Sequence, residues 1–295
     1  MTTATIDNKV KQVVSNIRNL PTPPIVFHQI QKVINDPKVS AGQIAKILQE
    51  DPAMSVKVLK LTNSAFYGLK REIESVKQAV IIVGLEAVKN LVLSASVLDM
   101  FKGKDIDHDF QEKFWRHSLA VGFCARLMAL MGKARGMLDP DAAFSGGLLH
   151  DIGKVILCCY LPKEYSLFKQ AQASDRTSAT YLIEERVLGY NHSQVGAILA
   201  EQWKLPRRLT EAVAFHHHPR LAQSDDIVAH VIHVSNYVAK KTFYDEFERH
   251  LVGNLDEGIL DFMQLTESDL DKLTEMLRQE YLKAETFMQM AGLAA

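Results

Sequence analysis

A histidine and an aspartate stand side by side in the segment 146–154, which reads GGLLHDIGK. His150 and Asp151 carry an imidazole and a carboxylate, which together can bind one metal ion and leave coordination positions open for water or a phosphate oxygen. Two ligands are too few for a site, so others must come from distant parts of the chain. Nine of the 11 histidines lie between His117 and His250, and they can supply these ligands.

The composition is that of an ordinary soluble globular protein. Of the 295 residues, 47% are hydrophobic and 23% are charged, and the formal net charge is −1. We therefore expect a large core, in two subdomains or one elongated helical domain. A net charge so close to zero argues against nucleic acid or a membrane surface as a partner.

The three cysteines and the N-terminus indicate the compartment. The cysteines lack the spacing of a zinc motif, and Cys158 and Cys159 lie in an apolar run that predicts buried structural thiols. The first residues show no signal-peptide pattern. We therefore expect a reducing, cytoplasmic location.

The hydrophobic pattern predicts an all-α fold. Segment 26–34 has apolar residues at the spacing of one buried helical face, and no segment alternates with period two. Ser40 and Ser75 each precede a glutamine by three residues, which is the sequence of a capping box. The apolar stretch 79–101 contains charged residues, so it predicts two packed helices broken near Gly84 rather than a membrane span.

The polar linker near residues 101–108 is the clearest boundary in the chain. We expect an N-terminal helical half in residues 1–104, a second helical subdomain in 105–250 and a helical extension in 251–295. Helices beyond the linker are predicted over residues 110–131, 139–151, 177–188, 192–203, 206–215, 226–242 and 266–292.

The order of the ligand-type residues resembles a known superfamily. After the doublet's upstream partner and the doublet itself come a single histidine, a histidine pair and a final polar residue: His117, His150-Asp151, His192, His216-His217 and Asn236. This order is similar to that of the HD superfamily, helical metal-dependent phosphohydrolases whose last ligand is an aspartate. Residues 148–154 resemble the HD-GYP branch, which hydrolyses cyclic dinucleotides. The chain departs from that branch because no Gly-Tyr-Pro segment follows residue 221.

Motifs of the N-terminal half resemble the HDOD family more narrowly. They are LPTPP at 20–24, IAKILQEDP at 44–52, LKLTNSAFYG at 59–68 and IESVKQAVIIVGL at 73–85. The resemblance covers about residues 20–219. It implies a bacterial signal-transduction module with a multi-helix HDOD fold, built from an N-terminal helical half and an HD-like half. In most members the HD ligands have decayed and no enzyme activity is assigned, whereas this chain keeps many ligand-type residues.

The resemblance implies a first metal site around the doublet. One ion would be held by His117, His150 and Asp151, with Asn236 as a weak, neutral fourth ligand in place of the superfamily's aspartate. Loss of that carboxylate weakens the case for hydrolysis, because it removes a negative charge that anchors the ion. The alternative for Asn236 is a residue that caps or bridges helices.

A second ion would use Asp151 as a bridge, together with His192, His216 and His217. Imidazoles with a carboxylate suit iron, manganese or zinc, and the sequence does not choose among them. Lys154, one helical turn after the doublet, would contact a phosphate group if the site is active. The alternative is a set of hydrogen-bonded or surface histidines without metal.

Two main hypotheses for function follow, with a weaker third. In the first, the protein is a signalling module that acts by binding a protein partner, a nucleotide or a metal, with a retained or vestigial metal site. In the second, it is a metal-dependent phosphohydrolase acting on a nucleotide or cyclic dinucleotide. In the third, it is a homodimeric scaffold that uses its C-terminal helix. The asparagine at the last ligand position and the missing Gly-Tyr-Pro segment favour the first.

Overall fold

The computed structural model describes residues 8–17, 20–34, 36, 38–65, 67–101, 106–223, 227–244, 251–284, 288–289 and 293. These residues form helices and turns, and no β-strand occurs among them, which confirms the predicted all-α fold. The chain divides into a smaller unit, Pro21–Lys102 with Gln279–Ala295, and a larger unit, Met1–Leu20 with Gly103–Arg278. The predicted boundaries at residues 104 and 250 stay predictions.

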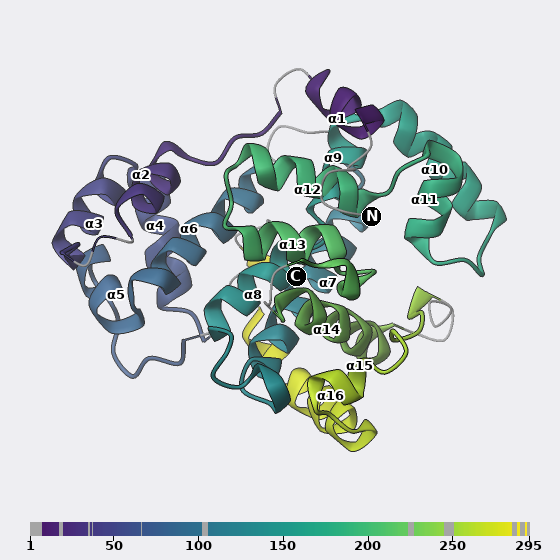
Figure 1. Ribbon diagram of the computed structural model, residues 1–295. Coiled ribbons are helices and arrows are strands. Elements are labelled where there is room, and N and C mark those ends of the chain that lie inside the picture. The colour runs from purple at the N-terminus through teal and green to yellow at the C-terminus, as the bar shows by residue number, and fades with distance from the viewer. Residues whose placement is uncertain are drawn as a thin grey trace. The chain divides into compact units, whose positions relative to one another are not determined.

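The smaller unit contains the purple-to-blue helices labelled α2 to α6 in Figure 1. In the described part of this unit, the helical segments are α2 (Ile25–Val33), α3 (Ala41–Gln49), α4 (Pro52–Thr62), α5 (Val76–Val83), α6 (Leu85–Asp99) and the 3-10 turn η5 (Leu282–Ala284). Ser40 and Gln43 form the complete capping box at the start of α3. Ser75 also caps its helix by accepting from the Gln78 amide, but the Gln78 side chain accepts from the Glu74 amide instead of closing the box.

Two turns of the smaller unit follow from local chemistry. Gly84 has a φ of 93° and separates α5 from α6, which confirms the predicted break. Asn63 donates its side-chain amide to the Ile73 carbonyl at 2.8 Å and accepts from the Ile73 amide at 2.7 Å. The side chain of Asn63 thus closes the loop after α4. Phe66 of the same loop lies outside the described residues.

The larger unit carries the remaining helices, except that residues 279–281 of α16 fall in the smaller unit. They are α1 (Asn8–Ser15), α7 (His108–Met128), η2 (Gly132–Ala134), α8 (Pro140–Leu149), α9 (Ile152–Tyr160), α10 (Pro162–Ser174), α11 (Thr180–Leu188), α12 (His192–Gln202), α13 (Arg207–Phe215), η3 (Pro219–Leu221), α14 (Val228–Phe243), α15 (Ile259–Met263) and α16 (Glu267–Tyr281). Four helices were not predicted from the sequence: α1, α9, α10 and α15. The single helix predicted over 266–292 is interrupted, because α16 ends at Tyr281 and a 3-10 turn follows it.

Glycines allow the helices of the larger unit to approach closely. A Cβ on Gly147 of α8 would lie 2.6 Å from the Cα of Gly122 on α7, and one on Gly153 of α9 would lie 1.8 Å from the His192 carbonyl oxygen on α12. Only a residue without a side chain fits between backbones at these distances. The close approaches bring the start of α9 against the start of α12.

Burial corrects the expectation that the adjacent cysteines are buried. Cys124 is buried, but Cys158 and Cys159 are only half-buried, because they lie near the end of α9 where it leaves the core.

Among the described residues, Pro140–Tyr160 is the one stretch long and apolar enough to cross a membrane, and 78% of its most apolar window is buried inside the fold.

Candidate metal centre

The ligand-type residues lie mostly at helix ends of the larger unit. His150 is the C-terminal cap of α8 and Asp151 the N-terminal cap of α9, so the doublet stands at a junction and not inside one helix. His192 is the first residue of α12, and His216 caps the C-terminus of α13. His117 lies in the middle of α7. Four segments far apart in sequence therefore meet at one place.

The two oxygens of Asp151 face two different groups of histidines. Asp151 Oδ2 lies 3.5 Å from His117 Nε2 and 3.3 Å from His150 Nε2. Asp151 Oδ1 lies 3.0 Å from His192 Nε2 and 3.6 Å from His216 Nε2. This is the arrangement in which a carboxylate can bridge two ions, one on each side.

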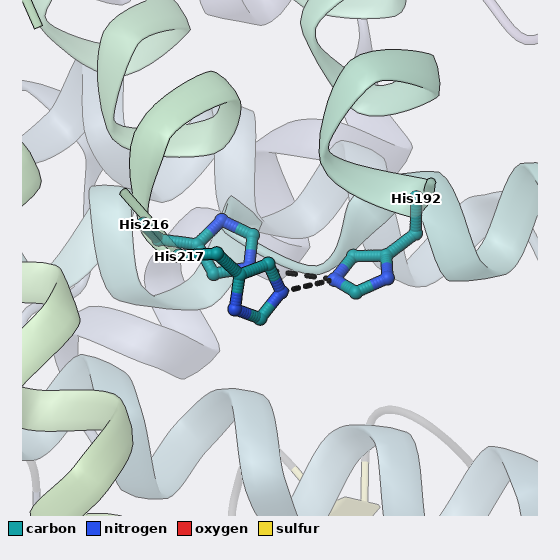
Figure 2. A group of neighbouring side chains, drawn as sticks. All are labelled: His192, His216 and His217. Atoms are coloured by element: carbon teal, nitrogen blue, oxygen red, sulfur yellow. Dashed lines mark hydrogen bonds between the residues drawn. The ribbon is translucent and has the colours of Figure 1, made fainter. Parts of the chain in front are cut away.

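The second group consists of three histidines from two helices, as Figure 2 shows. The Nε2 atom of His192 lies 3.0 Å from that of His217 and 3.4 Å from that of His216. All three, like His117, His150 and Asp151 in the first group, place one ligand atom within 4.8 Å of the others. The predicted ligands are thus brought together in two groups of three, with Asp151 between them.

Three of the histidines are oriented by a hydrogen bond to Nδ1, the ring nitrogen that faces away from Asp151. Two of these bonds go to backbone carbonyls. His150 Nδ1 donates to the Gly147 carbonyl at 2.6 Å, and His216 Nδ1 donates to the Val213 carbonyl at 2.8 Å. Because a carbonyl only accepts, the proton is on Nδ1 and the lone pair of a neutral ring is on Nε2. The inner nitrogens of both rings therefore present lone pairs toward Asp151.

Glu184 of α11 orients the third ring, and the sequence analysis missed it. Its Oε2 atom accepts from the His192 backbone amide at 2.7 Å and pairs with His192 Nδ1 at 2.6 Å. Glu184 is only 1% exposed. A buried carboxylate behind a histidine is the usual outer support of a metal ligand, because it fixes the ring and raises its basicity.

The inward-facing atoms fit a bound cation. In the described part of the chain, no hydrogen-bond partner reaches His117 Nε2, His150 Nε2 or Asp151 Oδ1, although all three atoms are buried. Lone pairs and a carboxylate that face one another repel, and leaving them unpaired is costly. A divalent ion would satisfy all of them at once.

The charge states of three histidines and of Asp151 favour metal ligation, whereas for His192 burial alone would lower the pKa but the neighbouring Glu184 raises it. Burial holds the pKa values of His117, His216 and His217 well below the ordinary value, so these rings are neutral near pH 7. Burial alone would raise the pKa of Asp151, but the neighbouring His150 and Lys154 bring it well below its usual range. Neutral imidazoles around an ionised carboxylate are the forms that bind metal.

Two lysines add positive charge beside the cluster. Lys154 Nζ donates to Asp151 Oδ2 at 2.6 Å. Burial and the charge of Lys154 lower the pKa of Lys240 on α14 to about 8, and Asp151 partly counters them. The sequence analysis did not single out Lys240, whose only signal was its spacing of one helical turn after Asn236.

A pocket of about 580 Å³ opens onto His117, Asp151 and Lys154. Its wall contains five aromatic residues, and its lining also contains cations that could meet a phosphate, together with several carboxylates. The aromatic residues are Phe110, Phe114, Tyr165, Phe168 and Tyr244, and the further cations are Lys113, Lys169 and Arg176.

Asn236 lies on α14 and belongs to neither group of three. It is buried, and its Oδ1 atom has no hydrogen-bond partner among the described residues. An unpaired buried amide oxygen is a weak, neutral donor to a metal. Of the histidines given no ligand role, His218 is exposed, His230 stacks on Phe262 at 4.4 Å, and His233 bonds to the backbone beside the cluster.

Sequence comparison decides the family. The profile of the HDOD domain matches residues 20–219, more than half of the chain. The chain belongs to the HDOD family. A curated relative from Treponema pallidum (strain Nichols), named only as an uncharacterized protein, is 28% identical over 207 residues. The match covers 70% of this chain, but the chain spans only 39% of that relative's length.

Solved structures share the fold of this HDOD protein. A proposed signal transduction protein from Marinobacter aquaeolei VT8 matches with a TM-score of 0.77 and 20% identity, over 98% of this chain and 66% of that one. A proposed metal-dependent phosphohydrolase from Shewanella amazonensis SB2B matches with a TM-score of 0.60 and 20% identity, over 93% and 95% of the two chains. At these identities the likeness shows the fold alone.

Proposed function

We propose that this HDOD protein is a signalling module that acts by binding, and that its larger unit holds one or two divalent ions beside a pocket for a phosphate-bearing ligand. One observation carries the proposal. Four imidazole nitrogens lie within 3.6 Å of the oxygens of the buried Asp151 carboxylate. Packing alone does not call for four imidazoles around one buried carboxylate, two of them with an unpaired Nε2 atom. The binding state would be passed to a protein partner.

The ligand atoms of the site narrow the choice of metal ion, and the residues beside it narrow the choice of bound molecule. Five histidines and one carboxylate, with no cysteine in either group, suit iron, manganese or zinc. A divalent ion bound here would supply Lewis-acid polarisation of a phosphate oxygen. Lys154 has its other N–H donors available for the same phosphate, and the aromatic residues among the pocket lining suit a nucleobase.

Metal content tests the proposal directly. The full chain, purified without chelators or a histidine tag, should carry iron, manganese or zinc in a near-stoichiometric amount by mass spectrometry. His150→Ala should lose most of it, because it removes a fully buried ligand. His218→Ala is the matched control, since this exposed residue directly follows His217. A wild-type protein that binds no added metal would refute the proposal.

Hydrolysis is the second candidate function, and the position of the pocket favours it. The pocket is lined by the ligand-type residues His117 and Asp151 themselves, so a phosphate ester could reach the centre. Lys154 would steady the charge on the phosphate. The test is turnover of bis-p-nitrophenyl phosphate and of nucleotides by the metal-loaded protein. Turnover that persists in Asp151→Ala would exclude this site as its source.

A further inference from the structure

The C-terminal end of α13 is capped by a side chain from another helix. His233 on α14 places Nδ1 at 2.8 Å from the carbonyl oxygen of His216. Because the carbonyl accepts, the imidazole must donate from Nδ1. The last carbonyls of a helix lack partners within the helix, and an imidazole N–H is a suitable cap for them. The bond fixes the backbone from which both His216 and His217 project.

The other nitrogen of the same ring reaches a segment far along the chain. His233 Nε2 accepts from the backbone amide of Asp256 at 3.1 Å. A ring that donates from Nδ1 and accepts at Nε2 is held at both ends in a single tautomer. It therefore links the end of α13 to the segment 251–258, and Asp256 lies beyond residue 219, where the family match ends.

We propose that His233 is a positioning residue that orients His216 and His217 and couples them to the segment 251–258. The consequence for metal binding rests on the proposed function, whereas the link itself does not. Leu251 of the same segment lines the pocket beside the metal centre. A ligand that presses on Leu251 therefore changes metal affinity, and bound metal changes the affinity of the ligand by the same factor.

The ring, and not the nearby ion pair, provides this coupling. Arg220 Nε lies 3.2 Å from Asp256 Oδ2, but the two side chains are 60% and 33% exposed. Exposed ion pairs contribute little to stability. Asp256→Asn, which keeps the backbone amide and loses the charge, should therefore behave like the wild type.

Two variants of His233 distinguish the effect of its hydrogen bonds from the effect of its side-chain size. His233→Phe keeps an aromatic ring and removes both hydrogen bonds. His233→Gln keeps one donor and one acceptor and should restore most of the effect. His230→Phe is the matched control on the same helix, because His230 stacks on Phe262 and its buried Nδ1 atom has no hydrogen-bond partner among the described residues.

Two measurements on the full chain test the coupling. The first is hydrogen exchange of the Asp256 amide in metal-free protein, which should become faster in His233→Phe and stay protected in His233→Gln and His230→Phe. The second is zinc affinity by chelator competition. It should fall about tenfold in His233→Phe, the low end for loss of a group that orients a ligand, since the bond is to the backbone.

The outcomes separate the inference from the proposed function. Wild-type protein that binds none of zinc, iron and manganese refutes the metal site, while the Asp256 amide still reports the link. Zinc affinity that is unchanged in His233→Phe refutes the positioning role, whatever happens to the amide. An equal loss of zinc in His233→Phe and His230→Phe also refutes it, because the effect then comes from general damage to α14.

Discussion

Replacing Gly153 by alanine should destabilise the larger unit, although alanine normally stabilises a helix by about 0.5–1 kcal/mol relative to glycine. The added Cβ would lie 1.8 Å from the carbonyl oxygen of His192, where ordinary contact begins at 3.4 Å. The backbones of α9 and α12 would have to separate by roughly 1.6 Å, which is 3.4 minus 1.8. Neither obstacle is a flexible side chain, because the next nearest atom is the Gly196 amide nitrogen.

The cost of this overpacking should be about 1–3 kcal/mol. A loss of 1 kcal/mol lowers Tm by about 2–4 °C in a unit of this size, so Tm should fall by about 2–12 °C. The same separation moves Asp151 Oδ1 away from His192 Nε2, which now lies at 3.0 Å. Bound metal should therefore fall together with Tm.

Differential scanning calorimetry and metal analysis measure both effects. Gly42→Ala in α3 is the control, because its Cβ would meet no atom closer than Ser40 Oγ at 3.8 Å. That variant should be neutral or slightly stabilised. If Gly153→Ala raises Tm as Gly42→Ala does and keeps its metal, the close approach of α9 and α12 is wrong.

Three further perturbations address the centre and its surroundings. Glu184→Gln keeps the shape but removes the charge behind His192, so zinc affinity by chelator competition should fall at least tenfold; unchanged affinity would contradict its supporting role. Asn236→Asp should lower Tm without metal, because it buries a carboxylate, and should raise zinc affinity about tenfold; a loss of affinity would show that residue 236 does not face the ion. Burial lowers the pKa of His230 from 6.5 to about 4, so the unfolded chain binds a proton between these values that the folded chain excludes. The free energy of unfolding should therefore fall as pH falls from 6.5 to 4, and His230→Gln should flatten that slope in urea titrations at several pH values.

The helices of this protein follow largely from local sequence. Ser40 begins α3 and Gly84 ends α5 because a cap and a positive φ depend on a few neighbouring residues. The helix predictions failed where the local sequence pattern and the tertiary packing favour different structures. The charged pattern after residue 266 continues past Tyr281, where α16 ends and a 3-10 turn follows. In α10 the apolar stripe is weak, since Phe168 is its one buried residue.

The sequence by itself determined which residues could bind metal and in what order they come. It could not determine that two oxygens of Asp151 face two sets of histidines, because those distances depend on the packing of α7, α8, α9, α12 and α13. Glu184 and Lys240 were missed for the same reason. Each is an ordinary polar residue of a helix until tertiary packing buries it beside the cluster. Burial, a property of the whole fold, turns a set of histidines into a candidate metal centre.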